Sequence, residues 1–145
     1  MWLAHLLTLQ FTDGGWEHAG PSSMCEALHE ASNQGVSVQL LAFAPDGGWY
    51  VLWEDGTSSW EGLPWRLQDK LSGRQYQGIS YSLPGVEQLA IGPHGEWFVR
   101  FLDGNWEIDD HSDECASAVG ELQANGFSIL GVMFGEDWSW CIQYG

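Results

Sequence analysis

Three tryptophan–glutamate pairs are the side chains of this sequence best suited to binding chemistry: Trp16-Glu17, Trp60-Glu61 and Trp106-Glu107. An indole face can stack on a sugar ring, while a neighbouring carboxylate accepts hydrogen bonds from the sugar hydroxyls. These six residues are therefore the predicted ligand-binding residues if the protein binds carbohydrate. The alternative is structural: each indole fills the space between a sheet and a helix. In that case each glutamate points to solvent, because side chains alternate along a strand.

A second set of residues is basic. Arg66, Lys70 and Arg74 supply three of the four positive charges in the chain, and their spacing places them on one side of a helix. In so acidic a protein, this stripe predicts a surface that docks onto an acidic face of a partner or of a second copy. Two alternatives remain: a solvated helix face, or ion pairs within the chain.

Two histidine–cysteine pairs have a spacing that lets their side chains converge on a helix: Cys25 with His29, and His111 with Cys115. A zinc site needs three or four ligands, and nothing in the sequence supplies the others. We therefore expect neither a metal nor a cofactor, and we expect Cys25 and Cys115 to be small buried apolar residues.

An acidic run lies just before the third predicted helix and contains Asp109, Asp110, Asp113 and Glu114. Such a run could hold calcium, but the glycine that an EF-hand turn requires is missing. Negative charge stabilises the N-terminus of a helix. The run is therefore predicted to cap the helix that follows it.

Motifs for nucleophilic catalysis are missing from the sequence, which has no Gly-x-Ser-x-Gly elbow, no phosphate-binding glycine loop with lysine and no His-Glu-x-x-His pair. The protein is therefore not expected to be an enzyme. A hydrolase that uses paired carboxylates stays an alternative, because the separation of two acids in space is not visible in a sequence.

Charge and composition narrow the classes of partner. Twenty acidic and four basic residues give a formal net charge of −16, which repels nucleic acid and anionic membrane surfaces. The apolar N-terminal residues 1–11 contain no Lys or Arg and predict a strand rather than a signal peptide. Three cysteines without close spacing indicate reduced thiols. The expected location is therefore the cytoplasm.

The chain contains an internal repeat. Asp-Gly followed closely by Trp-Glu occurs three times, with the tryptophans 44 and 46 residues apart (60 − 16 and 106 − 60). Residues 41–53 also match residues 89–101 in the phase of their apolar side chains. Alternating apolar runs joined by glycine-rich turns are typical of antiparallel hairpins.

After each Trp-Glu pair the apolar period changes from two to about 3.6, which predicts an amphipathic helix. Ser23 and Glu26 have the spacing of a capping box for the first helix, and Ser112 is a candidate cap for the third. Pro64 is expected to begin the second. The predicted buried stripes are Met24, Ala27, Leu28 and Ala31; Leu63, Leu67 and Leu71; and Cys115, Ala118, Val119 and Leu122.

These patterns predict an α+β fold that forms one tryptophan-rich repeat domain, residues 1–145. A pseudo-threefold β-β-β-α repeat would occupy residues 1–35, 36–78 and 79–126, and residues 127–145 would be a partial repeat able to complete the first. The antiparallel strands would form either a closed, propeller-like ring or an open, strongly curved sheet. No WD-dipeptide or kelch pattern is present.

The leading functional interpretation is a non-catalytic scaffold or interaction module that binds a protein or peptide, with self-association as one form of that binding. A lectin-like, carbohydrate-binding module is the first alternative and would use the Trp-Glu positions. A hydrolase with paired carboxylates is the second. Solvent exposure of the three tryptophans separates the first two interpretations, because a buried ring cannot serve as a sugar platform.

Overall fold

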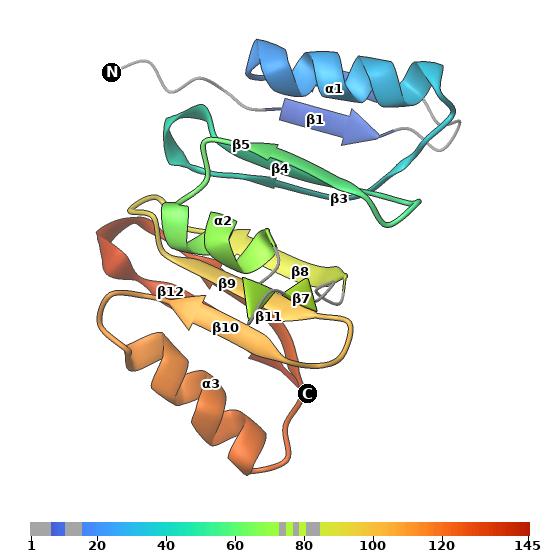
Figure 1. Cartoon of the computed structure of the whole chain (residues 1–145). Helices are drawn as coiled ribbons and strands as arrows, with labels where there is room; N and C mark the ends of the chain where they lie inside the picture. The colour runs from blue at the N-terminus through green and yellow to red at the C-terminus, as the bar shows by residue number, and fades with distance from the viewer. Residues whose placement is uncertain (1–6, 11–15, 73–74, 77–78, 81–84) are drawn as a thin grey trace. The chain divides into compact units, whose positions relative to one another are not determined.

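The described part of the chain contains three α-helices and several small antiparallel sheets (Figure 1). The computed structural model describes residues 7–10, 16–72, 75–76, 79–80 and 85–145. The chain divides into two compact units, Met1–Leu63 and Pro64–Gly145, called here the N-terminal and C-terminal units. Within the described ranges, no helix combines the length and apolarity needed to cross a membrane.

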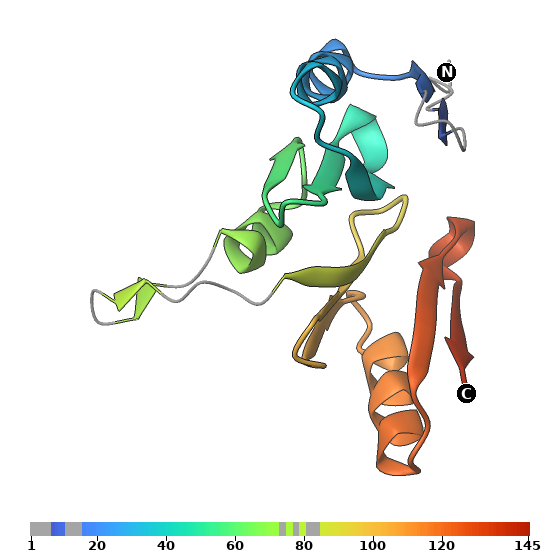
Figure 2. The same ribbon diagram turned by 90° about the vertical axis from the view of Figure 1, so that its right-hand side faces the viewer.

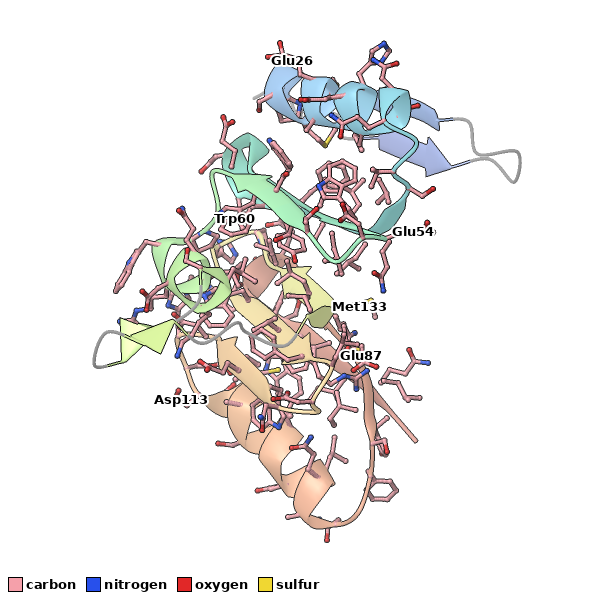
Figure 3. The ribbon with its side chains drawn as sticks, turned by 45° about the vertical axis from the view of Figure 1, so that its right-hand side comes forward. Glu26, Glu54, Trp60, Glu87, Asp113 and Met133 are labelled. Atoms are coloured by element: carbon pink, nitrogen blue, oxygen red, sulfur yellow. The ribbon has the colours of Figure 1, made fainter. Side chains whose placement is uncertain are left out.

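The N-terminal unit begins with a hairpin and one helix, followed by a three-stranded sheet. The hairpin joins β1 (Leu7–Gln10) to β2 (Trp16–Ala19), and the helix is α1 (Ser22–Asn33). The sheet has the order β3 (Val38–Phe43), β4 (Trp49–Trp53), β5 (Ser58–Glu61), with antiparallel neighbours. Figure 3 labels Trp60 on β5.

The core of the N-terminal unit forms between α1 and β4. Met24, Leu28 and Ala31 share one face of α1, as their spacing predicts, and pack against Trp49, Val51 and Trp53 of β4. All five residues of β4 are buried, so both faces of this central strand are covered.

The predicted capping box at the start of α1 is wrong. Ser23 lies inside the helix, the N-cap residue is Pro21, and no side chain caps the first turn. Instead, the Ser23 hydroxyl accepts a hydrogen bond from the Trp49 indole N–H at 3.1 Å. The serine therefore satisfies a polar atom of the core rather than a backbone N–H of the helix.

The C-terminal unit repeats the alternation of sheets and helices. It begins with α2 (Trp65–Leu71) and a short hairpin, β6 (Gln75–Tyr76) and β7 (Ile79–Ser80). A sheet follows in the order β8 (Val86–Ile91), β9 (Trp97–Phe101), β10 (Trp106–Asp109). The last elements are α3 (Glu114–Ala124) and the hairpin of β11 (Ile129–Phe134) and β12 (Trp140–Tyr144).

The predicted apolar faces of α2 and α3 are confirmed in part, since Leu71, Ala118 and Leu122 are only half-buried. Leu67 of α2 is fully buried, as are Cys115 and Val119 of α3. Figure 2 shows α3 lying along the β11–β12 hairpin, and its buried side chains meet Ile129 and Val132 in one apolar cluster. Cys25, Cys115 and Cys141 are all free thiols.

Asp110 caps α3 from a position three residues before the N-cap residue, Asp113. Its carboxylate is 6% exposed and accepts hydrogen bonds from the backbone N–H groups of Asp113, Cys115 and Ala116 at 2.7, 2.6 and 3.1 Å. Three N–H groups at the start of the helix thus share one carboxylate, which is what the helix dipole favours. The acidic run caps α3 as predicted, with Asp110 in the principal role.

The strands do not join into one large sheet. Hydrogen bonding divides the described strands among five sheets of two or three strands, and neither a closed barrel nor a propeller is found in this part of the chain. A helix follows β2, β5 and β10, and among the strands that the structure describes no ladder connects one sheet to the next. The ring or strongly curved sheet expected from the sequence is therefore not observed, and the repeat and the single domain stay predictions.

Candidate functional site

The two described tryptophans of the Trp-Glu pairs each lie against another aromatic ring. Trp60 is half-buried and stacks on the buried Tyr50, with ring centroids 6.2 Å apart and planes inclined by 24°. Trp106 stacks on Phe98 at 6.3 Å and 26°, and its indole N–H donates a hydrogen bond to the side-chain oxygen of Gln123 on α3. Both rings thus have structural contacts that reduce the indole face open to a ligand.

The neighbouring glutamates differ from each other. Glu61 is exposed, as strand alternation predicts, whereas the Glu107 carboxylate forms an ion pair with Lys70. The side chains of Trp16 and Glu17 lie outside the described residues. Carbohydrate binding at the three Trp-Glu pairs therefore stays a prediction.

Strand register shows that Trp60 and Trp106 do not occupy equivalent positions. Trp60 lies opposite Tyr50, the second residue of β4, whereas Trp106 lies opposite Arg100, the fourth residue of β9. The residue of β10 that corresponds to Trp60 is Ile108, which lies opposite Phe98, the second residue of β9. The common Trp-Glu motif therefore falls two residues later in β5 than in β10.

The basic stripe of α2 pairs with carboxylates of β10. Arg66 Nη1 lies 3.3 Å from Asp109 Oδ2, and Lys70 Nζ lies 2.5 Å from Glu107 Oε2. Arg74 lies outside the described residues. Arg100 pairs with Glu87 at 2.8 Å, so each Lys and Arg in the described ranges has a carboxylate partner within the chain. Pairing within the chain, one of the two alternatives to docking, is thus observed for Arg66 and Lys70.

A second feature, which sequence reasoning did not single out, is an open hollow of about 350 Å³ in the C-terminal unit. The first turn of α2, the β8–β9 turn and the end of β10 form its walls. We call it the aromatic hollow, and the lining side chains used below are Trp65, Arg66, His94, Trp97, Asp109 and His111.

Trp65 is the most exposed large apolar residue in the described part of the chain, at 73%. It is the first residue of α2 and lies off the helix face that carries the buried Leu67. A large indole on the polar side of an amphipathic helix is a sequence signal for this site, because such a ring has no core to enter.

Trp138 packs against two histidines that line the aromatic hollow. Its ring stacks on His94 with centroids 4.3 Å apart and planes inclined by 23°, and it meets the edge of His111 at 5.6 Å. His111, Asp137 and Trp138 have φ values of 61°, 56° and 61°. Left-handed backbone at non-glycine residues is uncommon and costly, and it concentrates where function requires a particular geometry.

The β8–β9 turn that carries His94 is held by a buried carboxylate. Glu96 is 2% exposed, and its Oε2 accepts a hydrogen bond from the His94 backbone N–H at 2.8 Å. Gly92 is needed beside it, because a Cβ there would lie 2.4 Å from Glu96 Oε2 and 2.7 Å from Phe134 Cβ. The position of His94 is therefore set by tight packing within the unit.

Trp97, which lines the aromatic hollow, carries an unused hydrogen-bond donor. It is 3% exposed, and its indole N–H has no acceptor among the described residues. Buried polar groups nearly always have a partner, so an orphaned donor in the wall of a hollow requires an explanation.

In the described part of the chain, neither histidine–cysteine pair belongs to a group of three side chains that could hold a metal ion. His111 faces Asp109 and Trp138, while Cys115 is buried in the core cluster around Phe98. Over the described ranges, no three His, Cys, Asp or Glu side chains are grouped closely enough to hold a metal ion. The burial of Cys115 and the charge of Asp110 raise the pKa of the Cys115 thiol to about 11.

Comparison with known proteins gives no relative: the chain matches no family model, and neither a curated protein nor a solved structure is significantly similar to it.

Proposed function

We propose that this protein is a non-catalytic interaction module that binds a protein or peptide segment at the aromatic hollow. The observation that carries the proposal is the pair of exposed indoles, Trp65 and Trp138, which are 73% and 56% exposed beside an open hollow. Tryptophan exposed in this way loses contact with water when a partner covers it, and Trp is strongly enriched among the residues that dominate binding energy.

The surroundings of the two indoles support a peptide ligand. Polar groups that can bind peptide side chains or main chain lie beside apolar rings in one site, which is the usual composition of a binding pocket. Asp109, His94 and His111 offer such groups within the lining of the aromatic hollow. The ring of Trp138 packs against both His94 and His111, so these three aromatic side chains support one another.

We also propose that the sheets are copies of one β-β-β-α repeat, as the sequence predicts. In support, every bound of β3, β4 and β5 recurs 48 residues later in β8, β9 and β10 (86 − 38 and 109 − 61). The register irregularity after Val38 recurs after Val86.

Exchanging turn residues 54–57 for residues 102–105 tests whether the two three-stranded sheets are equivalent. The exchange should change the free energy of unfolding by less than about 0.5 kcal/mol. Loss of the folded N-terminal unit would contradict it.

The binding proposal is tested by selecting peptides from a random display library against the folded protein. Substitution Trp65→Ala or Trp138→Ala should weaken binding of the selected peptides at least tenfold, because truncating an anchor residue costs roughly 2 kcal/mol or more. Trp140→Ala is the matched control, since Trp140 is also an exposed indole of the C-terminal unit but does not line the aromatic hollow. Equal loss with the control variant, or none with the other two, would refute the proposed site.

Carbohydrate binding is the second candidate, and one observation favours it at the same site. Trp65 offers an exposed ring next to Arg66 and Asp109, a donor and an acceptor suited to sugar hydroxyls. A screen against an array of glycans would test it. The candidate would be supported by a glycan whose binding is lost in Trp65→Ala and kept in Trp140→Ala, and absence of such a glycan would remove it.

A further inference from the structure

We propose that the aromatic hollow recognises a basic side chain, an arginine or lysine of the bound peptide, and that Arg66 occupies this position when the hollow is empty of peptide. The inference rests on the proposed peptide-binding function and names the chemistry that the site selects.

Arg66 lies between two groups that recognise a cation. Its guanidinium carbon is 5.3 Å from the centroid of the Trp65 ring, and its Nη1 donates a hydrogen bond to Asp109 Oδ2 at 3.3 Å. An indole face attracts a cation through its quadrupole, and a carboxylate attracts it through charge and hydrogen bonding. The chain thus displays, with its own Arg66, the contacts that the hollow would make with the basic residue of a ligand.

These contacts of Arg66 are weak enough to be exchanged. The Arg66 side chain is 61% exposed, and an exposed ion pair contributes only about 0–1 kcal/mol. Lys70, one helical turn further along α2, is different: its side chain is 21% exposed and lies 2.5 Å from Glu107. We therefore assign Lys70 to holding α2 against β10, and Arg66 to the exchangeable position.

The charge of the protein favours the same ligand. The formal net charge is −16, and one carboxylate, that of Asp109, lines the aromatic hollow. Such a field draws cationic ligands toward the surface and repels anionic ones. A peptide with arginine or lysine gains from this field, from the Trp65 ring and from Asp109 together.

The test uses three labelled Gly-Ser peptides that differ only in carrying three arginines, three glutamines or three glutamates, with binding followed by fluorescence anisotropy. The arginine peptide should bind best. Substitution Arg66→Ala should tighten its binding by roughly 3- to 30-fold, because the substitution frees the Trp65 face and the Asp109 carboxylate.

Lys70→Ala is the matched control for charge. It removes one positive charge from the same helix, so any effect of the overall field must be similar in the two variants. If the inference is right, Lys70→Ala tightens binding far less than Arg66→Ala. Equal tightening in both variants would overturn the inference, and so would weaker binding in Arg66→Ala. Circular dichroism of each variant confirms that α2 is retained.

Asp109→Asn gives a second measurement, with Glu107→Gln as its charge-matched control. Loss of arginine-peptide binding in the first variant alone is the expected result, and equal loss in both would contradict the assigned role of Asp109. A sugar or an acidic ligand would accept hydrogen bonds from the Arg66 guanidinium. Arg66→Ala would therefore weaken the binding of such a ligand. If library-selected peptides depend on Trp65 and Trp138 but carry no basic residue, the proposed function holds and this inference fails.

Discussion

Asp110 provides the sharpest test of how the fold of the C-terminal unit is held. Its buried carboxylate accepts three backbone hydrogen bonds at the start of α3, whereas Asp113, the N-cap residue, is exposed and makes no side-chain cap bond. Asp110→Asn and Asp113→Asn remove the same charge from the same acidic run. A comparison of these two variants therefore separates the hydrogen bonds from the effect of charge on the helix dipole.

The expected loss of unfolding free energy in Asp110→Asn follows from the three hydrogen bonds to this carboxylate. An amide in place of the Asp110 carboxylate keeps one acceptor oxygen and presents an NH₂ group to N–H donors that need an acceptor. A hydrogen bond to a charged group contributes about 1.5–3 kcal/mol, and a buried donor left without a partner costs about 1–3 kcal/mol. We expect Asp110→Asn to destabilise the C-terminal unit by about 3 kcal/mol. For Asp113→Asn we expect only the loss of a dipole interaction, about 0.3–1 kcal/mol.

Urea unfolding followed by circular dichroism measures the free energy of unfolding, and amide hydrogen exchange shows whether the loss is located in α3. The backbone amides of Cys115 and Ala116 should lose protection first, because they bond to Asp110 Oδ2. If the two variants are destabilised equally, charge at the helix terminus explains the whole effect, and the argument from the three hydrogen bonds is refuted.

The other predictions concern a thiol and two glycines. Because burial and a nearby carboxylate raise the pKa of Cys115 to about 11, iodoacetamide at pH 8 should label the exposed Cys141 and leave Cys115 unmodified in the folded protein, as mass spectrometry would show. In the unfolded chain the Cys115 thiol ionises at a lower pH than in the folded protein. The contribution of this thiol to stability is therefore complete below about pH 8.5 and is lost as the pH rises toward 11. Cys115→Ala should reduce this loss of stability at high pH. Gly92→Ala should cost at least about 2 kcal/mol, since the new Cβ would lie 2.4 Å from a Glu96 oxygen. Gly120→Ala should instead stabilise α3 by about 0.5–1 kcal/mol, because nothing lies within 4 Å of its Cβ; thermal melting of both variants measures the difference.

Periodicity of apolar residues predicts the three helices and the centres of their buried faces. Met24 and Leu28 of α1 and Val119 of α3 are buried where the 3.6-residue period places them. Residues that alternate in β9, such as Trp97 and Val99, are buried as well. These features depend on local spacing, which a sequence shows directly.

The recurrence of Trp-Glu does not give the offset between the two three-stranded sheets, because the motif occupies different positions in β5 and β10. The Asp-Gly turns at Asp55 and Asp103 are 48 residues apart (103 − 55), which equals the offset between the strands, whereas Trp60 and Trp106 are 46 apart. Turn geometry sets the pairing of the strands that flank it. Alignment on the turns would therefore have shown that Trp60 corresponds to Ile108.

The aromatic hollow was not predictable from spacing. It combines Trp65, His94 and His111 from three separate parts of the sequence, and their approach depends on tertiary packing. The cap of α3 was missed in part for a similar reason: Asp110 reaches the helix from before the N-cap, through a left-handed backbone at His111 and Asp113.

The ion pairs of Arg66, Lys70 and Arg100 affect how strongly copies of the protein repel one another in solution. Since these cations are already matched to carboxylates within the chain, two copies that approach each other meet mainly as like-charged particles. Added salt shortens the range of that repulsion to about 8 Å at 0.15 M. The osmotic second virial coefficient should accordingly be large and positive at low ionic strength and should fall as salt is added. Low ionic strength is therefore the condition in which we expect the least aggregation of this protein.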